Sequence, residues 1–171
     1  MITVKKRNPS FSDPLERITF LDTEGDILRQ EFIEQNGGLV LSIMYEYDGK
    51  KSLISRNIFT GITPILIAFQ IYDRSDNSSF RIEDYKVEGG AYKKISSMVG
   101  VYEDQNFQSK SIWYDANGRE VYSAVLVDGR INYSDAEGNL IEYISDFLKT
   151  SFPGYQTFES IFDDLLNKAR S

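Results

Sequence analysis

Closely spaced turn signals constrain the fold of this chain more than any other feature of its sequence. The stretch 109–143 carries Asn117-Gly118, Asp128-Gly129 and Glu137-Gly138, each flanked by runs rich in Val, Ile, Tyr and Trp. Glycine after Asn or Asp supplies the positive φ of a two-residue β-hairpin loop without a Cβ clash. The stretch therefore predicts successive antiparallel hairpins, with two-residue loops at the Asn-Gly and Asp-Gly positions.

Alternation of apolar and polar residues extends the same pattern toward the N-terminus. The clearest period-two run is Leu39 to Tyr47, which places Leu39, Leu41 and Ile43 on one face. The other strands that we expect before the hairpin series span residues 18–21, 27–34, 52–59, 62–72 and 80–87. The fold class predicted is mainly β, an antiparallel meander sheet of about nine or ten strands. A sheet of that size tends to be curled or barrel-like.

Residues 91–101 fit a helix better than a strand. Tyr92, Ile95, Met98 and Val99 recur at helical spacing, which favours a short helix or an irregular turn. Gly100 and the shortness of the stretch leave a strand as the alternative.

The apolar period changes after residue 144. Ser145 can cap a short helical turn that residues 152–154 (Phe-Pro-Gly) end. Thr157 caps an amphipathic helix over 157–170, whose apolar face we expect to pack on the sheet. The chain is thus predicted to be one domain, with a polar arm at 1–13, a β-meander at 15–144 and the C-terminal helix.

The amino-acid composition excludes several kinds of chemistry. The sequence of 171 residues contains no Cys and no His, which excludes disulfides, thiol nucleophiles and Ser-His or Cys-His catalysis. Carboxylates cluster at 22–26 and 135–137, but neither cluster has the alternating spacing of an EF-hand calcium loop. We therefore expect no cofactor, no metal site and no catalytic residue, and interpret these acids as turn residues.

Net charge indicates what kind of partner is compatible with the chain. With 19 basic and 26 acidic residues, the formal charge is 19 − 26 = −7, which argues against binding to nucleic acid or to an anionic membrane. The most apolar run, 62–71, is too short to span a bilayer, and the N-terminal residues do not resemble a secretory signal. We expect a cytoplasmic protein with a protein partner, and a basic partner would fit best.

The unit Tyr114-Asp-Ala-Asn-Gly-Arg-Glu-Val121 resembles one copy of the YD repeat of bacterial wall-associated and toxin-shell proteins. Looser echoes occur at 21–27 and 134–140. The resemblance covers eight residues and implies shared hairpin-turn chemistry, in which the Asp before each turn accepts hydrogen bonds from its own turn backbone.

These observations favour a non-enzymatic protein-interaction domain, for example a bacterial immunity-type or scaffold protein that binds a basic partner. Aromatic side chains combine apolar area with a polar tip, which suits a recognition surface. The residues predicted to contact the partner are Tyr45, Glu46, Tyr47, Trp113, Asp115 and Tyr122.

Two other functions remain open at this stage. The first is a β-barrel that binds a small apolar ligand, with an interior lined by Leu39, Leu41, Ile43, Ile65, Ile67 and Phe69. The second is an enzyme that uses two carboxylates. Neither the oligomeric state nor the biological process follows from the sequence.

Overall fold

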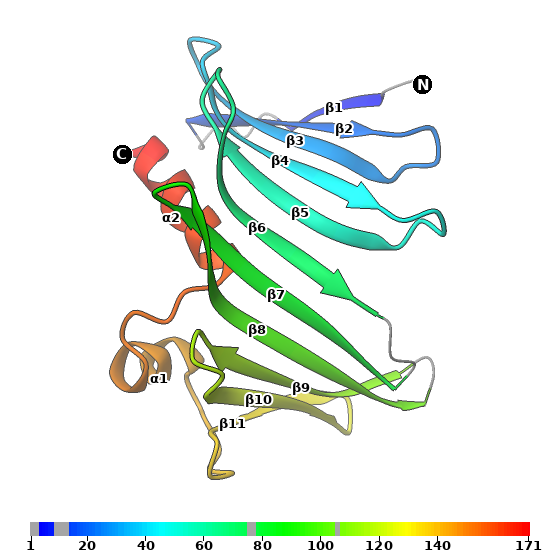
Figure 1. Cartoon of the computed structure of the whole chain (residues 1–171), viewed down its shortest axis with the longest axis vertical. Coiled ribbons are helices and arrows are strands. Elements are labelled where there is room, and N and C mark those ends of the chain that lie inside the picture. The colour runs from blue at the N-terminus through cyan, green and yellow to red at the C-terminus, as the bar shows by residue number, and fades with distance from the viewer. Residues whose placement is uncertain (1–3, 9–13, 75–77, 105–106) are drawn as a thin grey trace. The chain divides into compact units, whose positions relative to one another are not determined.

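The structure of the chain, a computed structural model, describes residues 4–8, 14–74, 78–104 and 107–171. Within these residues it contains eleven strands and two helices, and the strands follow one another in chain order across an antiparallel sheet (Figure 1). The strands are β1 (Val4–Asn8), β2 (Leu15–Leu21), β3 (Ile27–Glu34), β4 (Leu39–Tyr47), β5 (Leu53–Thr60), β6 (Ile65–Asp73), β7 (Ser79–Glu88), β8 (Ala91–Asp104), β9 (Phe107–Asp115), β10 (Glu120–Val127) and β11 (Arg130–Ser134); the helices are α1 (Ile144–Ser151) and α2 (Phe158–Arg170).

The predicted fold class, a mainly β antiparallel meander with a C-terminal helix, is confirmed. Among the described residues the sheet is not closed, since β1 and β11 form its two edges. Strand β1 lies within the stretch predicted as a polar arm, and it pairs antiparallel with β2. Its sequence, VKKRN, suits an edge strand, because basic side chains discourage further pairing.

The chain divides into two compact units. The first unit comprises Met1–Gln70, Lys86–Tyr92 and Phe158–Ser171, and the second comprises Ile71–Tyr85 and Lys93–Thr157. Strands β6, β7 and β8 contribute residues to both units. The prediction of a single domain stays a prediction.

Residues 91–101 form part of strand β8, so the prediction of a short helix there was wrong. Gly89 and Gly90 both have positive φ, 57° and 79°, as a two-residue hairpin loop requires, and they join β7 directly to β8. From Ser96 onward β8 pairs with β9. The helical spacing of the apolar residues is therefore overridden by the hairpin and by strand pairing.

Five hairpin turns share one backbone geometry. Each turn contains five residues. The N–H of the first residue donates to the carbonyl of the fifth, and the N–H of the fourth residue donates to the carbonyl of the first, with N···O distances of 2.9–3.3 Å. The fourth residue has positive φ in every case. This is a three-residue loop in which a type I turn ends in a left-handed residue. The five turns are Asp22–Asp26, Glu34–Gly38, Asp48–Ser52, Asp115–Arg119 and Asp135–Asn139.

The loop at Asn117-Gly118 thus contains three residues, not the two expected from its dipeptide. The Asp128-Gly129 loop does contain two residues, since Val127 pairs with Arg130. Both of its residues have positive φ, 49° and 74°, as a type I′ turn requires.

Aspartate side chains hold four of the five shared turns, as the sequence predicted. The Oδ1 atoms of Asp22, Asp48, Asp115 and Asp135 each accept the N–H groups two and four residues later, at 2.8–3.1 Å. At Asp135, a further hydrogen bond from the Asn139 side chain is the main cause that lowers the pKa of the carboxyl. These acids therefore serve the turns that contain them.

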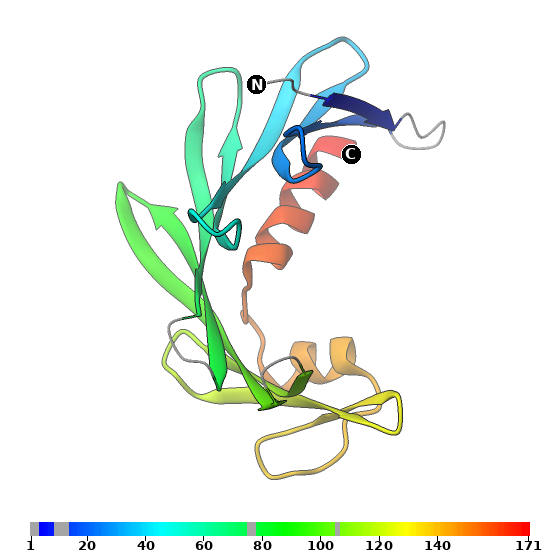
Figure 2. The same cartoon turned by 90° about the vertical axis from the view of Figure 1, so that its right-hand side faces the viewer.

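In the first unit, helix α2 packs on one face of the sheet (Figure 2). Phe158 and Leu166 are buried, and the Phe162 ring meets the Phe32 ring edge to face at 5.3 Å. Leu41 lies opposite Phe32 in the register and is buried on this same face. The predicted packing of the C-terminal helix on the sheet is confirmed.

In the second unit, helix α1 begins after Tyr143, which makes no side-chain capping bond, so Ser145 is not the cap. After the helix, the Phe152 ring lies 4.5 Å beneath the guanidinium of Arg119, in the turn between β9 and β10. In the described part of the chain, no helix is long and apolar enough to cross a membrane.

Candidate functional site

The six residues predicted to contact a partner fall into two groups. Three lie on β4 in the first unit, and the other three lie on β9 and β10 in the second. The first group is Tyr45, Glu46 and Tyr47, and the second is Trp113, Asp115 and Tyr122.

The two tyrosines of β4 use their hydroxyl groups within the fold. The Tyr45 hydroxyl donates to the Gln30 side chain at 2.9 Å, and the Tyr47 hydroxyl donates to the Ile27 carbonyl at 2.8 Å. Burial raises the pKa of both phenols. Because successive residues of a strand alternate faces, Glu46 projects from the opposite face of the sheet. The three residues therefore do not form one surface.

Asp115 holds the turn between β9 and β10. Its carboxylate accepts the N–H groups of Asn117 and Arg119 at 3.0 and 2.9 Å, and the Arg119 side chain at 3.1 Å. These bonds give Asp115 a structural task in the turn.

Trp113 and Tyr122 are the two predicted residues that the structure brings into contact. They are register partners on β9 and β10, and their rings stack 4.4 Å apart with an interplanar angle of 14°. Tyr133 on β11 meets Tyr122 at 6.1 Å and 62°. Three aromatic rings thus form a row across three neighbouring strands.

A row of small residues lies beside the aromatic row on the same face of the sheet. Gly100 is the register partner of Ser111, which is in turn the partner of Ala124. Ser111 and Ala124 are two positions from Trp113 and Tyr122 along their strands, so they share that face. Gly100 shares it as well, because it is two positions from Met98, the register partner of Trp113. Small side chains between larger ones leave a hollow, and Ser111 and Ala124 line it.

Larger apolar residues bound the hollow on its other sides. Leu126 and Ile131 are register partners at the far side, and Tyr133 lies beside Ala124. The hollow has a volume of about 290 Å³, and we call it the aromatic groove. The residues that line it are Ser109, Lys110, Ser111, Trp113, Ala124, Val125, Leu126, Ile131 and Tyr133.

Phe80 from β7 covers the other end of the row of small residues. A Cβ atom placed on Gly100 would lie 2.2 Å from Cε1 of Phe80, so the ring rests directly on the glycine. The Phe80 ring also contacts the Tyr102 ring at 5.5 Å. A side chain at position 100 would displace this pair.

The lining of the groove carries little formal charge. Among the described residues that line it, Lys110 carries the one formal charge. Burial, with a smaller contribution from nearby Tyr133, raises the pKa of Tyr122 to about 12, so its phenol is neutral at neutral pH. Leu126 and Ile131 keep 38% and 59% of their surface exposed, which leaves apolar area available to a partner.

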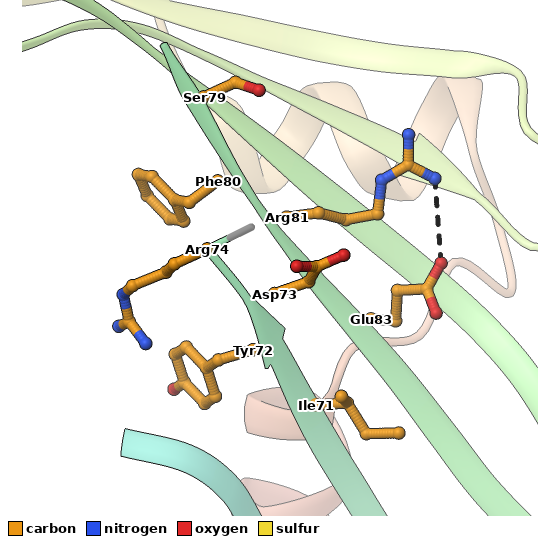
Figure 3. Close-up of a pocket in the computed structure, with 8 residues that line it drawn as sticks. All are labelled: Ile71, Tyr72, Asp73, Arg74, Ser79, Phe80, Arg81 and Glu83. Carbon is orange, nitrogen blue, oxygen red and sulfur yellow. Dashed lines mark ion pairs between the residues drawn. The ribbon is translucent and has the colours of Figure 1, made fainter. Parts of the chain in front are cut away.

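A larger hollow of about 640 Å³ lies where β6 ends and β7 begins (Figure 3). Its residues divide between the two sides of these strands, with Tyr72, Arg74 and Phe80 on one side and the acidic side chains Asp73 and Glu83 on the other. A ligand could contact only one of the two groups at a time. We therefore place the candidate site in the aromatic groove.

Other candidate chemistry can be placed from the structure as well. In the residues that the structure describes, no group of three or more His, Cys, Asp or Glu side chains could hold a metal ion. Of the residues proposed to line a ligand cavity, Leu41 and Ile43 are buried on the face that α2 covers. Ile65, in contrast, is 61% exposed.

Sequence reasoning identified Trp113 and Tyr122 but missed the rest of the groove. Gly100, Ser111 and Ala124 are distant in the sequence and unremarkable there. Only the register of β8, β9 and β10 aligns them. Ile131, an apolar residue beside the Asp128-Gly129 turn, was the signal that could have extended the prediction to β11.

Comparisons with known proteins bear on the fold alone. No protein-family model and no curated protein matches the chain. A crystal structure of a protein with unknown function from Bacteroides fragilis is similar, with a TM-score of 0.54 and 12% sequence identity. The match covers 67% of this chain and 93% of that one, which supports the meander fold.

Proposed function

We propose that the chain is a non-enzymatic protein-interaction domain whose contact surface is the aromatic groove. The observation that carries this proposal is the stacked pair of Trp113 and Tyr122 beside a hollow floored by Ser111 and Ala124. Aromatic residues are enriched at the energetic centres of protein interfaces, because their rings exclude water from a large contact area.

The size of the groove favours a protein side chain over a small-molecule ligand. Pockets for drug-sized ligands occupy roughly 300–1,000 Å³ and bury most of the ligand, whereas this groove, at about 290 Å³, is at the small end of that range and is open to solvent on one side. It suits one large apolar or aromatic side chain of a partner, which would contact the exposed side chains of Leu126 and Ile131.

The charge of the chain favours a basic partner. A formal charge of −7 attracts cationic surfaces over long distances and accelerates their association, while the uncharged contacts of the groove act at short range. A bacterial immunity-type protein or a scaffold protein in the cytoplasm would be a concrete case.

A phage-displayed library of random peptides, panned on the purified protein, tests the proposal. We expect enrichment of peptides that carry a large apolar or aromatic side chain, and their binding should change the fluorescence of Trp113, the single tryptophan of the chain. Association of peptides with basic residues should slow as ionic strength rises, because salt screens the steering charge.

Two isoleucines provide a matched pair of variants. Ile131 lines the groove and is 59% exposed, whereas Ile65 in the first unit is 61% exposed and is not one of the residues that line it. Ile131→Ala should weaken peptide binding and Ile65→Ala should not. Ala124→Trp should abolish binding, because the indole fills the groove. Equal binding to all three variants, or no enriched peptide, would refute the proposal.

A further inference from the structure

Within the described part of the chain, the backbone of β11 leaves one position open at the edge of the sheet. The Ile141 N–H donates to the Tyr133 carbonyl at 2.9 Å, so the polar groups of Tyr133 point away from β10. Backbone groups alternate direction along a strand. Ile131, two residues earlier, therefore also directs its N–H and carbonyl outward, while those of Arg130 and Asn132 face β10.

The chain itself already uses part of this edge. Leu140 forms an antiparallel bridge with Ser134, and together with the Ile141 bond it covers the last two residues of β11. The first residues of β11 precede the two that Leu140 and Ile141 cover. An antiparallel extended segment is thus compatible with the geometry of the edge.

Side chains near the open position favour a partner as well. Sheet edges in soluble proteins are commonly protected by charged residues or proline, but β11 has one charged residue, Arg130, and no proline. Leu126, Val127 and Ile131 at this end of the sheet are 38%, 46% and 59% exposed. The edge is therefore apolar where its backbone is open.

From these features we infer that the partner binds by strand addition: an extended segment pairs antiparallel with β11 at Ile131 and places one apolar side chain beside the aromatic groove. This inference rests on the proposed function and specifies the form of the partner. In strand addition, backbone hydrogen bonds give affinity and side-chain pockets give specificity. Ile131 supplies both, since it lines the groove and has outward backbone groups.

The register of such a segment dictates its chemistry. A residue opposite Ile131 would project its side chain on the groove face, about 5 Å from the Ile131 side chain and within diagonal reach of Tyr133. Its two neighbours would project on the other face, where Arg130 and Asn132 are exposed. The segment that fits is alternating, with an apolar or aromatic residue at the centre and polar residues on each side.

N-methylation of a bound peptide tests the inference. An enriched library peptide is synthesised in two N-methylated forms. One form is methylated at the odd-numbered amides and the other at the even-numbered amides. Because alternate amides of an extended peptide point to opposite edges, each form blocks one backbone edge. Loss of the hydrogen bonds to Ile131 should weaken one form about tenfold or more, while the other form binds like the parent peptide. The parent peptide should also slow hydrogen exchange of the Ile131 amide.

The outcomes separate this inference from the proposed function. If both methylated forms bind like the parent and Ala124→Trp still abolishes binding, the groove binds the peptide but strand addition is wrong. If the peptide binds Ala124→Trp as well as the unmodified protein, the proposed function fails too. Unchanged exchange at Ile131 in the complex would also overturn strand addition.

Discussion

The guanidinium of Arg56 lies 4.5 Å above the ring of Phe158, the first residue of helix α2. The same guanidinium donates to the Gln70 side chain at 3.0 Å through Nε and forms an ion pair with Glu159. Arg56 on β5 thus joins β6 and the N-terminal turn of α2 within the first unit. This contact and the Phe32–Phe162 contact fix the helix on the sheet at two places.

The first prediction concerns Phe158, which is 1% exposed. Phe158→Ala should lower the free energy of unfolding by about 3–5 kcal/mol, because it leaves a cavity and removes the ring beneath Arg56. Urea denaturation measures the change. Glu159→Gln is the matched control and should cost less than about 1 kcal/mol, since the Glu159 side chain is 57% exposed. A similar loss in both variants would contradict this account of the packing.

The second prediction uses the shared turn geometry. Lys51 has φ 63° at the position where the other four turns have glycine, a conformation that costs a non-glycine residue about 1–2 kcal/mol. Lys51→Gly should raise the free energy of unfolding by up to about 1 kcal/mol, because the relief of this strain exceeds the additional backbone entropy that glycine loses on folding. Gly118→Ala should lower it by a similar amount. Thermal unfolding of both variants provides the test, and shifts of the same sign would show that turn strain is not the cause.

The third prediction concerns the contact of Gly100 with Phe80. Gly100→Ala should destabilise the protein by about 1–3 kcal/mol, because the new methyl group overlaps the ring. In the background of Phe80→Ala, the same substitution should cost much less. A double-mutant cycle measured by urea denaturation isolates this coupling. Additive effects would mean that the ring does not rest on the glycine in solution.

Local patterns predicted the strands well, because turn residues and period-two alternation act over a few positions. Strands 27–34 and 39–47 have the predicted bounds, and the aspartates hold their turns as expected. The prediction failed at β8, where Tyr92, Ile95 and Met98 imitate helical spacing. There the Gly89-Gly90 hairpin and pairing with β9 determine the conformation.

The candidate site was less accessible to sequence reasoning than the fold. Trp113 and Tyr122 could be identified because they are aromatic residues that flank a strong turn signal. The floor of the groove could not, because Ser111 and Ala124, with Gly100 next to them, become neighbours only through the register of three strands. That register depends on irregularities between Glu120 and Tyr122 and between Val101 and Tyr102, which lie outside the turn signals of the sequence.

The last prediction concerns the titration of Tyr122. Its pKa is about 12 in the folded chain, against about 10 for an exposed tyrosine. Between these values the folded chain keeps a proton that the unfolded chain has lost. The contribution of Tyr122 to stability is therefore complete below about pH 10 and is lost as the pH rises through 12.

Tyrosinate absorbance of the folded protein, compared with that of Tyr122→Phe, measures this pKa directly. We expect the difference between the two titrations to have its midpoint near 12. Tyr133→Phe should move that midpoint downward, because the charge on Tyr133 contributes to the raised pKa of Tyr122. A midpoint near 10, the value of an exposed tyrosine, would mean that water reaches the phenol, and the wall of the aromatic groove would then be more open than the stacked pair implies.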